Sequence, residues 1–194
     1  MLKSVARKEL LAERKSLTAS DCIKWDALLL IQFQKLDFSN VHTVANFYPL
    51  ENHNEPNSLL FTRYLKLMIP GIQMVYPVVN TISATISFYK ESETVRFNEW
   101  GIAEPTSNEM IEPSIIDAVI VPLIGFDIRG HRIGYGKGFY DKYFENYPKH
   151  RPRIGVCYFE PLSNIEDTHE FDVPLTHCIT VSYTHLTLPT IYSV

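Results

Sequence analysis

Residues 115–144 read IIDAVIVPLIGFDIRGHRIGYGKGFYDKYF. The run 115–126 is almost continuously apolar, as expected of a central parallel strand that is buried on both faces of a sheet. A glycine-rich segment follows it directly, and residues 139–147 then have the pattern of a short helix that ends before Pro148. Because ligands of parallel α/β sheets bind beyond the carboxyl ends of the strands, this strand–loop–helix order indicates a ligand site at the glycine-rich segment.

The rest of the chain alternates helix and strand patterns around this stretch. Thr18, Ser20 and Asp21 can cap a helix that begins at about residue 20. Helices are expected over 1–16, 20–35 and 58–67, and further strands over 41–48, 72–79, 84–90, 153–159 and 177–181. Residues 91–114 have little pattern and contain two prolines, so they are expected to be irregular. This alternation predicts a three-layer α/β/α sandwich with a mainly parallel, Rossmann-like sheet.

The composition is that of an ordinary soluble globule, with 45% hydrophobic and 21% charged residues. A length of 194 residues suits one domain. The formal net charge of −4 argues against a general nucleic-acid binder, which would usually be basic. No apolar run approaches the ~18 residues that span a bilayer, and the charged start lacks the pattern of a signal peptide. We therefore expect a cytoplasmic monomer with neither a nucleic acid nor a membrane as partner.

The end of the chain differs from the rest. Residues 179–194, ITVSYTHLTLPTIYSV, contain no Asp, Glu, Lys or Arg. A native edge strand is one interpretation, and a foreign tail that begins at about Ser182 is the other, which we favour. The expected organisation is one α/β domain over 1–181, followed by an atypical tail over 182–194 whose native origin is open.

The glycine-rich segment has the chemistry of an anion site. Glycine lets the backbone approach a phosphate closely, and Arg132 and Lys137 add positive charge. Asp141, just after the loop, could hold Mg²⁺ beside phosphates. These residues predict a polyphosphate pocket. The segment matches neither G-x-x-x-x-G-K-[ST] nor G-x-G-x-x-G, so a surface turn without a ligand stays an alternative.

The N-terminal helix carries a basic stripe. Lys3, Arg7 and Arg14 fall within roughly 40° of one another at about 100° per residue. They could reach the same anion, or they could form a solvated face. The aromatic residues of 139–147 are more typical of core packing than of a stacking platform, with Tyr140, nearest the loop, as the exception.

The glycine-rich stretch resembles a known family, the 5-formyltetrahydrofolate cyclo-ligases, also called methenyltetrahydrofolate synthetases. RIGYGKGFYDKY, residues 132–143, is similar to the signature of that family. DAVIVPLIGFDIRGHRIG, residues 117–134, is similar to the strand and lead-in that precede the signature. This part of the resemblance is quite specific.

Weaker elements extend the resemblance over residues 3–180. Lys3 and Arg7 are similar to the family's N-terminal nucleotide-binding pair. FYPLENHNEPN, residues 47–57, resembles its folate-binding strand and loop, and GIAEP, residues 101–105, resembles a further element. After Thr180 the similarity stops, which supports the interpretation of the end as a foreign tail.

The resemblance implies a ligase of one-carbon metabolism. ATP and Mg²⁺ would drive the cyclisation of 5-formyltetrahydrofolate to 5,10-methenyltetrahydrofolate, with release of ADP and phosphate. The formyl oxygen would attack the γ-phosphate, N10 would close on the activated carbon, and phosphate would leave. The folate, with or without a polyglutamate tail, would be the partner. Phosphoryl transfer needs positioning and charge neutralisation more than covalent chemistry from the protein, which agrees with the residues present.

The resemblance also implies the roles of particular residues. Lys137 and Arg132 would be catalytic, and Asp141 would hold Mg²⁺. The residues expected to hold ATP are Lys3, Arg7, Arg132, Gly134, Tyr135, Gly136, Lys137, Gly138, Phe139 and Tyr140. The residues expected to bind the folate are Glu55, as a hydrogen-bond acceptor for the pterin, and Tyr48, Trp100 and Tyr140.

The match has one departure near its end. The family often carries H-D-x-x-x-D there, and its second Asp is associated with the metal, whereas this chain has Thr176 at that place. Metal binding would then rest on Asp141. Two other functions remain open at this point: a sugar-phosphate isomerase-like α/β enzyme that needs neither ATP nor Mg²⁺, and a non-catalytic nucleotide-binding module.

Overall fold

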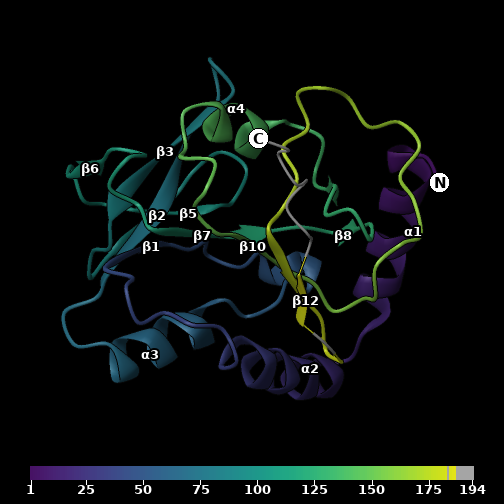
Figure 1. Cartoon of the computed structure of the whole chain (residues 1–194), viewed down its shortest axis with the longest axis horizontal. Coiled ribbons are helices and arrows are strands. Elements are labelled where there is room, and N and C mark those ends of the chain that lie inside the picture. Colours follow the sequence, from purple (N-terminus) through teal and green to yellow (C-terminus); the bar gives the residue numbers. More distant parts are fainter. Residues whose placement is uncertain (183, 187–194) are drawn as a thin grey trace, which may run out of the picture.

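The computed structural model describes residues 1–182 and 184–186, and its centre is a mixed sheet (Figure 1). The strand order is β12-β11-β10-β7-β1-β2-β3-β6. Neighbours from β11 to β2 pair in parallel, and the pairs at the two edges are antiparallel. The strands of this sheet are β1 (Thr43–Ala45), β2 (Gln73–Asn80), β3 (Thr85–Lys90), β6 (Met110–Ile111), β7 (Ala118–Pro122), β10 (Arg153–Val156), β11 (His177–Ile179) and β12 (Thr184–Leu186).

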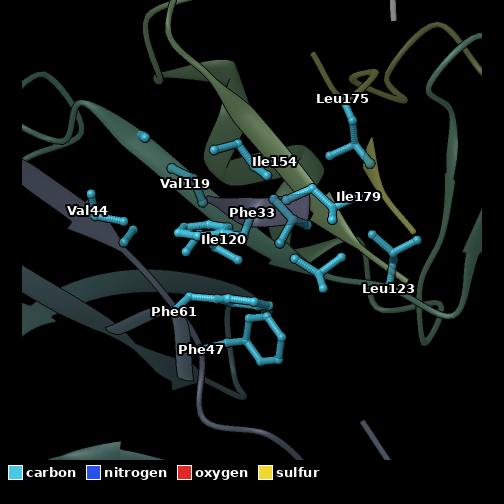
Figure 2. Close-up of a cluster of buried hydrophobic side chains, with 14 of the residues drawn as sticks. Phe33, Val44, Phe47, Phe61, Val119, Ile120, Leu123, Ile154, Leu175 and Ile179 are labelled. Carbon is cyan, nitrogen blue, oxygen red and sulfur yellow. The ribbon is translucent and has the colours of Figure 1, made fainter. Parts of the chain in front are cut away.

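Strand β7 covers 118–122 of the apolar run 115–126 that the sequence places at the centre. It pairs in parallel with β1 on one side and β10 on the other. Its residues Ala118 to Val121 have no exposed surface, because packed layers cover both faces. Val119 and Ile120 lie in a cluster of buried side chains drawn from several elements (Figure 2). The expected central parallel strand is confirmed.

Helices cover both faces of the sheet and one of its ends. They are α1 (Lys3–Ser16), α2 (Ala19–Phe33), α3 (Leu59–Met68) and α4 (Phe139–Glu145). In Figure 1, α2 and α3 lie below the sheet, α4 lies above it and α1 stands at its right-hand end. Helix α2 contacts β11 and α3, while α4 contacts β3. The predicted α/β class with a mainly parallel sheet is confirmed.

The start of α2 follows from its capping residues. The Thr18 hydroxyl accepts a hydrogen bond from the Asp21 backbone N–H, and the Asp21 carboxylate accepts one from the Thr18 backbone. This reciprocal capping box satisfies two backbone donors that a helix otherwise leaves unpaired. Such a box is typically worth about 1 kcal/mol, so it fixes where α2 begins after the short link from α1.

Residues 91–114 are more regular than the sequence predicts. Strands β4 (Val95–Phe97) and β5 (Ala103–Pro105) form an antiparallel hairpin, and β6 joins the edge of the main sheet. All three residues of β4 are exposed, so this strand has no buried face that a sequence pattern could indicate. The expectation of an irregular segment was therefore wrong for these residues.

The last described strand bears on the atypical tail without deciding its origin. The backbone of β12 pairs antiparallel with β11, so the chain turns back along the sheet edge there. Most of the segment 182–194 lies outside the described residues. The division into a domain over 1–181 and an atypical tail stays a prediction.

Two further features concern the helices and the cysteines. No helix within the described part of the chain is long and apolar enough to cross a membrane. Cys157 and Cys178 are buried free thiols, whereas Cys22 is half-buried.

Gly155 of β10 shows how tightly the core is packed. A Cβ at this position would lie 2.6 Å from the nearest side-chain atoms of Leu123 and Leu175. We expect Gly155→Ala to lower the free energy of unfolding by about 1–3 kcal/mol, measured by urea denaturation, because the added methyl has no room. Gly134→Ala is the control, since nothing lies within 4 Å of its Cβ position. Equal stability of the two variants would contradict this description of the core.

Candidate active site

The candidate site lies beyond the carboxyl ends of β1 and β7. Because these strands are parallel neighbours, the loops that follow them leave the same edge of the sheet. The loop after β1 contains the short helix η1 (Glu51–His53) and then Glu55. The chain after β7 forms the hairpin of β8 (Gly125–Phe126) and β9 (Arg132–Ile133), and residues 134–138 link this hairpin to α4.

Buried Asp127 builds the turn of that hairpin. Its Oδ1 accepts hydrogen bonds from the backbone N–H groups of Arg129 and His131, and its Oδ2 accepts from the Arg129 guanidinium and from Ile165 N–H. Asp127 is fully buried, so these donors replace the water that an ionised carboxylate would otherwise require. Sequence reasoning gave this residue no role, although an aspartate that begins a D-x-x-G turn just after a strand is a recognisable turn signal.

The glycine-rich loop keeps its backbone open. Gly136 and Gly138 have φ of +86° and +69°, in the left-handed region that side chains other than glycine rarely adopt. A Cβ at Gly134 or Gly138 would meet nothing within 4 Å. The loop therefore borders free space, as a cradle for an anion requires.

Two cations stand at this loop without a carboxylate partner. Arg7 donates from Nε to the Gly134 carbonyl at 2.7 Å, and its guanidinium carbon lies 3.6 Å from the Cβ position of Gly136. Lys137 is exposed, and its Nζ lies 5.5 Å from the ring centroid of Trp100. Within residues 1–182, no ion pair holds either cation. Both charges are available to an anionic ligand.

Two other predicted nucleotide-binding residues are engaged inside the protein. Lys3 forms an ion pair with Asp172. Arg132, whose side chain is 7% exposed, donates to Asp141 Oδ1 at 2.5 Å and to the Val173 carbonyl at 2.6 Å. These ion pairs leave the predicted roles untested, but they show that Arg132 also has a structural role. Asp172 is a partner that sequence reasoning missed.

Asp141, the predicted magnesium ligand, is partly occupied by the same contacts. Its Oδ1 also accepts a hydrogen bond from Val173 N–H at 3.1 Å. Across the described residues, no group of three His, Cys, Asp or Glu could hold a metal by itself. Thr176, which replaces the expected second Asp, hydrogen-bonds the backbone N–H and carbonyl of Arg153 instead. Asp141 therefore offers one carboxylate, and most of the ligands of a magnesium ion would have to come from elsewhere.

A buried polar chain links the loop to Glu55. Arg14 Nη2 donates to the Tyr135 hydroxyl at 2.6 Å, and that hydroxyl donates to Glu55 Oε1 at 2.5 Å. Glu55 Oε2 accepts from Leu50 N–H at 2.8 Å. Burial raises the pKa of Glu55, and these donors oppose the increase. Arg14 is 2% exposed, so the interpretation of its helix face as solvated was wrong at this residue.

The predicted aromatic residues lie in different surroundings. Trp100, in the β4–β5 hairpin, stacks on Phe139 with ring centroids 5.8 Å apart. The Tyr140 hydroxyl is buried and has no hydrogen-bond partner in the described structure, and burial raises its pKa. Tyr48 stacks on Tyr76 at 4.2 Å, and burial raises the pKa of Tyr48 to about 12. The loop thus has an aromatic wall, and Tyr143 and Phe144 pack in the core as expected.

A buried glutamate that sequence reasoning missed attaches the hairpin that carries Trp100. Glu104 Oε1 accepts hydrogen bonds from Val79 N–H of β2 at 2.9 Å and from the Asn98 side-chain amide at 3.0 Å. Glu104 lies in the GIAEP segment and is 3% exposed. Its carboxylate therefore positions the hairpin against the main sheet.

Fold and site together define an α/β protein with an open glycine loop that faces a buried carboxylate across the edge of its sheet. A model of the 5-formyltetrahydrofolate cyclo-ligase family matches residues 1–181. The chain belongs to this family, as the glycine-rich stretch indicated.

Individual proteins agree with this assignment. A 5-formyltetrahydrofolate cyclo-ligase of Mycoplasma pneumoniae is 30% identical over 161 residues, which cover 81% of this chain and 86% of the relative. One of Escherichia coli is 29% identical over 148 residues, covering 73% and 79% of the two chains. The solved structure of a 5,10-methenyltetrahydrofolate synthetase of Aquifex aeolicus superimposes with a TM-score of 0.81 at 25% identity, covering 100% of this chain and 97% of the other.

The Arg132–Asp141 pair gives a prediction about stability. Asp141→Asn removes the charge that balances a buried guanidinium, so the free energy of unfolding should fall by about 1–3 kcal/mol in urea denaturation. Glu109→Gln is the matched control, because the Lys90–Glu109 pair is exposed and should matter by about 0.5 kcal/mol or less. If the two variants lose the same stability, the Arg132–Asp141 pair has no structural importance.

Proposed function

We infer that this chain cyclises 5-formyltetrahydrofolate to 5,10-methenyltetrahydrofolate at the carboxyl edge of its sheet, with conversion of ATP to ADP and phosphate. The observation that carries the inference is the family match over residues 1–181, which includes the glycine loop and Glu55. Membership of this family also argues against a sugar-phosphate isomerase. The polar contacts of the site support separate tasks for its two sides.

The loop side suits the nucleotide. Residues 134–138 offer open backbone, and Arg7 and Lys137 offer charges that no carboxylate of the described chain neutralises. Phosphate oxygens are strong acceptors for such charge-assisted hydrogen bonds. Lys3 and Arg132 would bind phosphate only after exchanging or sharing their present carboxylate partners. Arg7 and Lys137 are therefore the first contacts that we assign to ATP.

The same donor set fits a magnesium ion that is held mainly by phosphates. Mg²⁺ commonly takes one or two protein carboxylates together with phosphate oxygens and water. Asp141 would supply such a carboxylate through Oδ2, which has no hydrogen-bond donor within the described residues. When bound, Mg²⁺ would neutralise charge on the transferred phosphoryl group.

The opposite side suits the folate. Glu55 is a buried acceptor, and Trp100, Phe139 and Tyr140 supply apolar surface close to the loop. Glu55 would accept hydrogen bonds from N–H groups of the pterin. The aromatic side chains would exclude water from the reacting formyl group. Lys137 is a loop residue whose ammonium lies beside Trp100 of this wall, and it would meet the phosphoryl group and stabilise charge that moves during its transfer.

The direct test of the function is an assay of the purified protein with 5-formyltetrahydrofolate, ATP and Mg²⁺. The methenyl product is detected by its near-ultraviolet absorbance, and ADP is measured in parallel. We expect product only when ATP and Mg²⁺ are both present, with one ADP released for each product. Binding of ATP without turnover would favour the non-catalytic module, and cyclisation at the same rate without ATP would overturn the proposed reaction.

Lys137 gives the sharpest prediction about catalysis. Because its ammonium meets developing charge, Lys137→Ala should lower kcat by about 10²-fold, with a smaller rise in the KM for ATP. The melting temperature should stay the same, since the side chain is exposed. Lys149→Ala, an exposed lysine after α4, is the control for loss of charge alone. Changes below about twofold in both constants would remove Lys137 from the site.

A further inference from the structure

One hydroxyl joins the glycine loop, which we assign to the nucleotide, to Glu55, which we assign to the folate. Tyr135 lies in the glycine loop, yet its side chain points to Glu55, and its ring stacks on His53 with centroids 5.5 Å apart. Arg14 reaches the same hydroxyl from α1. The other nitrogens of Arg14 are held by the carbonyls of His53 at 2.9 Å and Leu123 at 3.0 Å. The hydroxyl is therefore fixed between a cation and an anion.

The charges at the two ends of this chain need the hydroxyl between them. Arg14 is 2% and Glu55 8% exposed, and the two form no direct ion pair. Taking an ion out of water is costly unless hydrogen bonds replace the lost solvent. Tyr135 supplies one bond to each, as acceptor from Arg14 and donor to Glu55. Burial and the Glu55 charge raise the pKa of Tyr135, so the phenol keeps the proton that it donates.

Glu55 keeps acceptor capacity for a ligand. Tyr135 occupies one site on Oε1 and Leu50 N–H one on Oε2. Each oxygen of an ionised carboxylate has about two acceptor sites, so one remains on each. Two fixed acceptors side by side match a ligand that presents two neighbouring N–H groups, but only while the carboxylate is ionised.

We propose that Tyr135 is a positioning residue: its hydroxyl, anchored by Arg14, holds Glu55 as a fixed, charged acceptor for the folate. This inference rests on the proposed function and changes one expectation from the sequence. Tyr135 was expected to hold ATP, whereas its side chain now belongs to the folate side of the loop. The loop then serves the nucleotide through its backbone and Lys137, and serves the folate through Tyr135.

The test is Tyr135→Phe, which keeps the ring and its stacking on His53. A hydrogen bond to a charged group is worth enough for the KM for the folate substrate to rise about tenfold or more at neutral pH. The KM for ATP and the kcat should change by less than about twofold, because neither depends on this bond. Tyr147→Phe is the matched control, since it removes one hydroxyl whose bond to the Pro152 carbonyl lies outside the site.

A pH profile separates positioning from general damage to the structure. The groups that face Glu55 are Tyr135, Arg14 and Tyr140. His53 lies nearby, and burial and the charges of Lys15 and Arg14 lower its pKa. The Tyr135 bond opposes the raised pKa of Glu55, so its loss should raise that pKa further. Folate binding needs the ionised form of Glu55. As the pH is lowered, binding should therefore begin to weaken at a higher pH in Tyr135→Phe than in the wild type.

A double-mutant cycle completes the test. If Tyr135 acts through Glu55, then adding Tyr135→Phe to Glu55→Gln should raise the KM for the folate by less than about a further twofold. The inference would be overturned by additive effects, by a selective rise in the KM for ATP, or by an unchanged pH profile. Turnover by the wild type would leave the proposed function in place in each of these cases. A wild-type protein that makes no methenyl product would overturn the proposed function, and this inference with it.

Discussion

The parallel pairing of β7 between β1 and β10 is the constraint on which the rest of the structure depends. It requires a strand without polar side chains on either face, and Ala118 to Val121 meet that requirement completely. Because the three strands run the same way, the loops after β1 and β7 emerge together. Glu55 and Tyr135, which are 80 residues apart in the chain, are thereby brought within hydrogen-bond distance.

Charge at the site is arranged on two levels. Lys3 and Arg132 are balanced by Asp172 and Asp141, and these pairs also fasten the segment near residue 172 to α1 and α4. Arg7 and Lys137 have no such partner within the described chain and border the open backbone of the loop. A site organised in this way can hold its shape without a ligand and still present uncompensated positive charge to one.

The sequence predicted features that depend on local pattern or on a long specific motif. The burial of 118–121, the Thr18 cap and the strand–loop–helix order could be predicted because each has its cause within a few residues. The pairing of Arg14 with Tyr135 could not, since it depends on how α1 docks against β8 and β9. The same holds for Glu104, whose partner Val79 lies on another strand. The helical stripe identified Arg14 as a basic residue on the right face, but periodicity carries no information about what that face meets.

The position of α1 has a consequence for how the protein is made. Its residues Lys3, Arg7 and Arg14 bond partners that lie 169, 127 and 121 positions further along the chain. A ribosome releases the N-terminus first, so α1 is complete long before any of these partners has been synthesised. Until then Arg14, which is buried in the folded protein, remains in water. Contacts of such long sequence separation form slowly. The site is consequently among the last parts of the molecule to assemble, and a nascent chain that has not yet reached Tyr135 lacks both the glycine loop and the partner of Glu55.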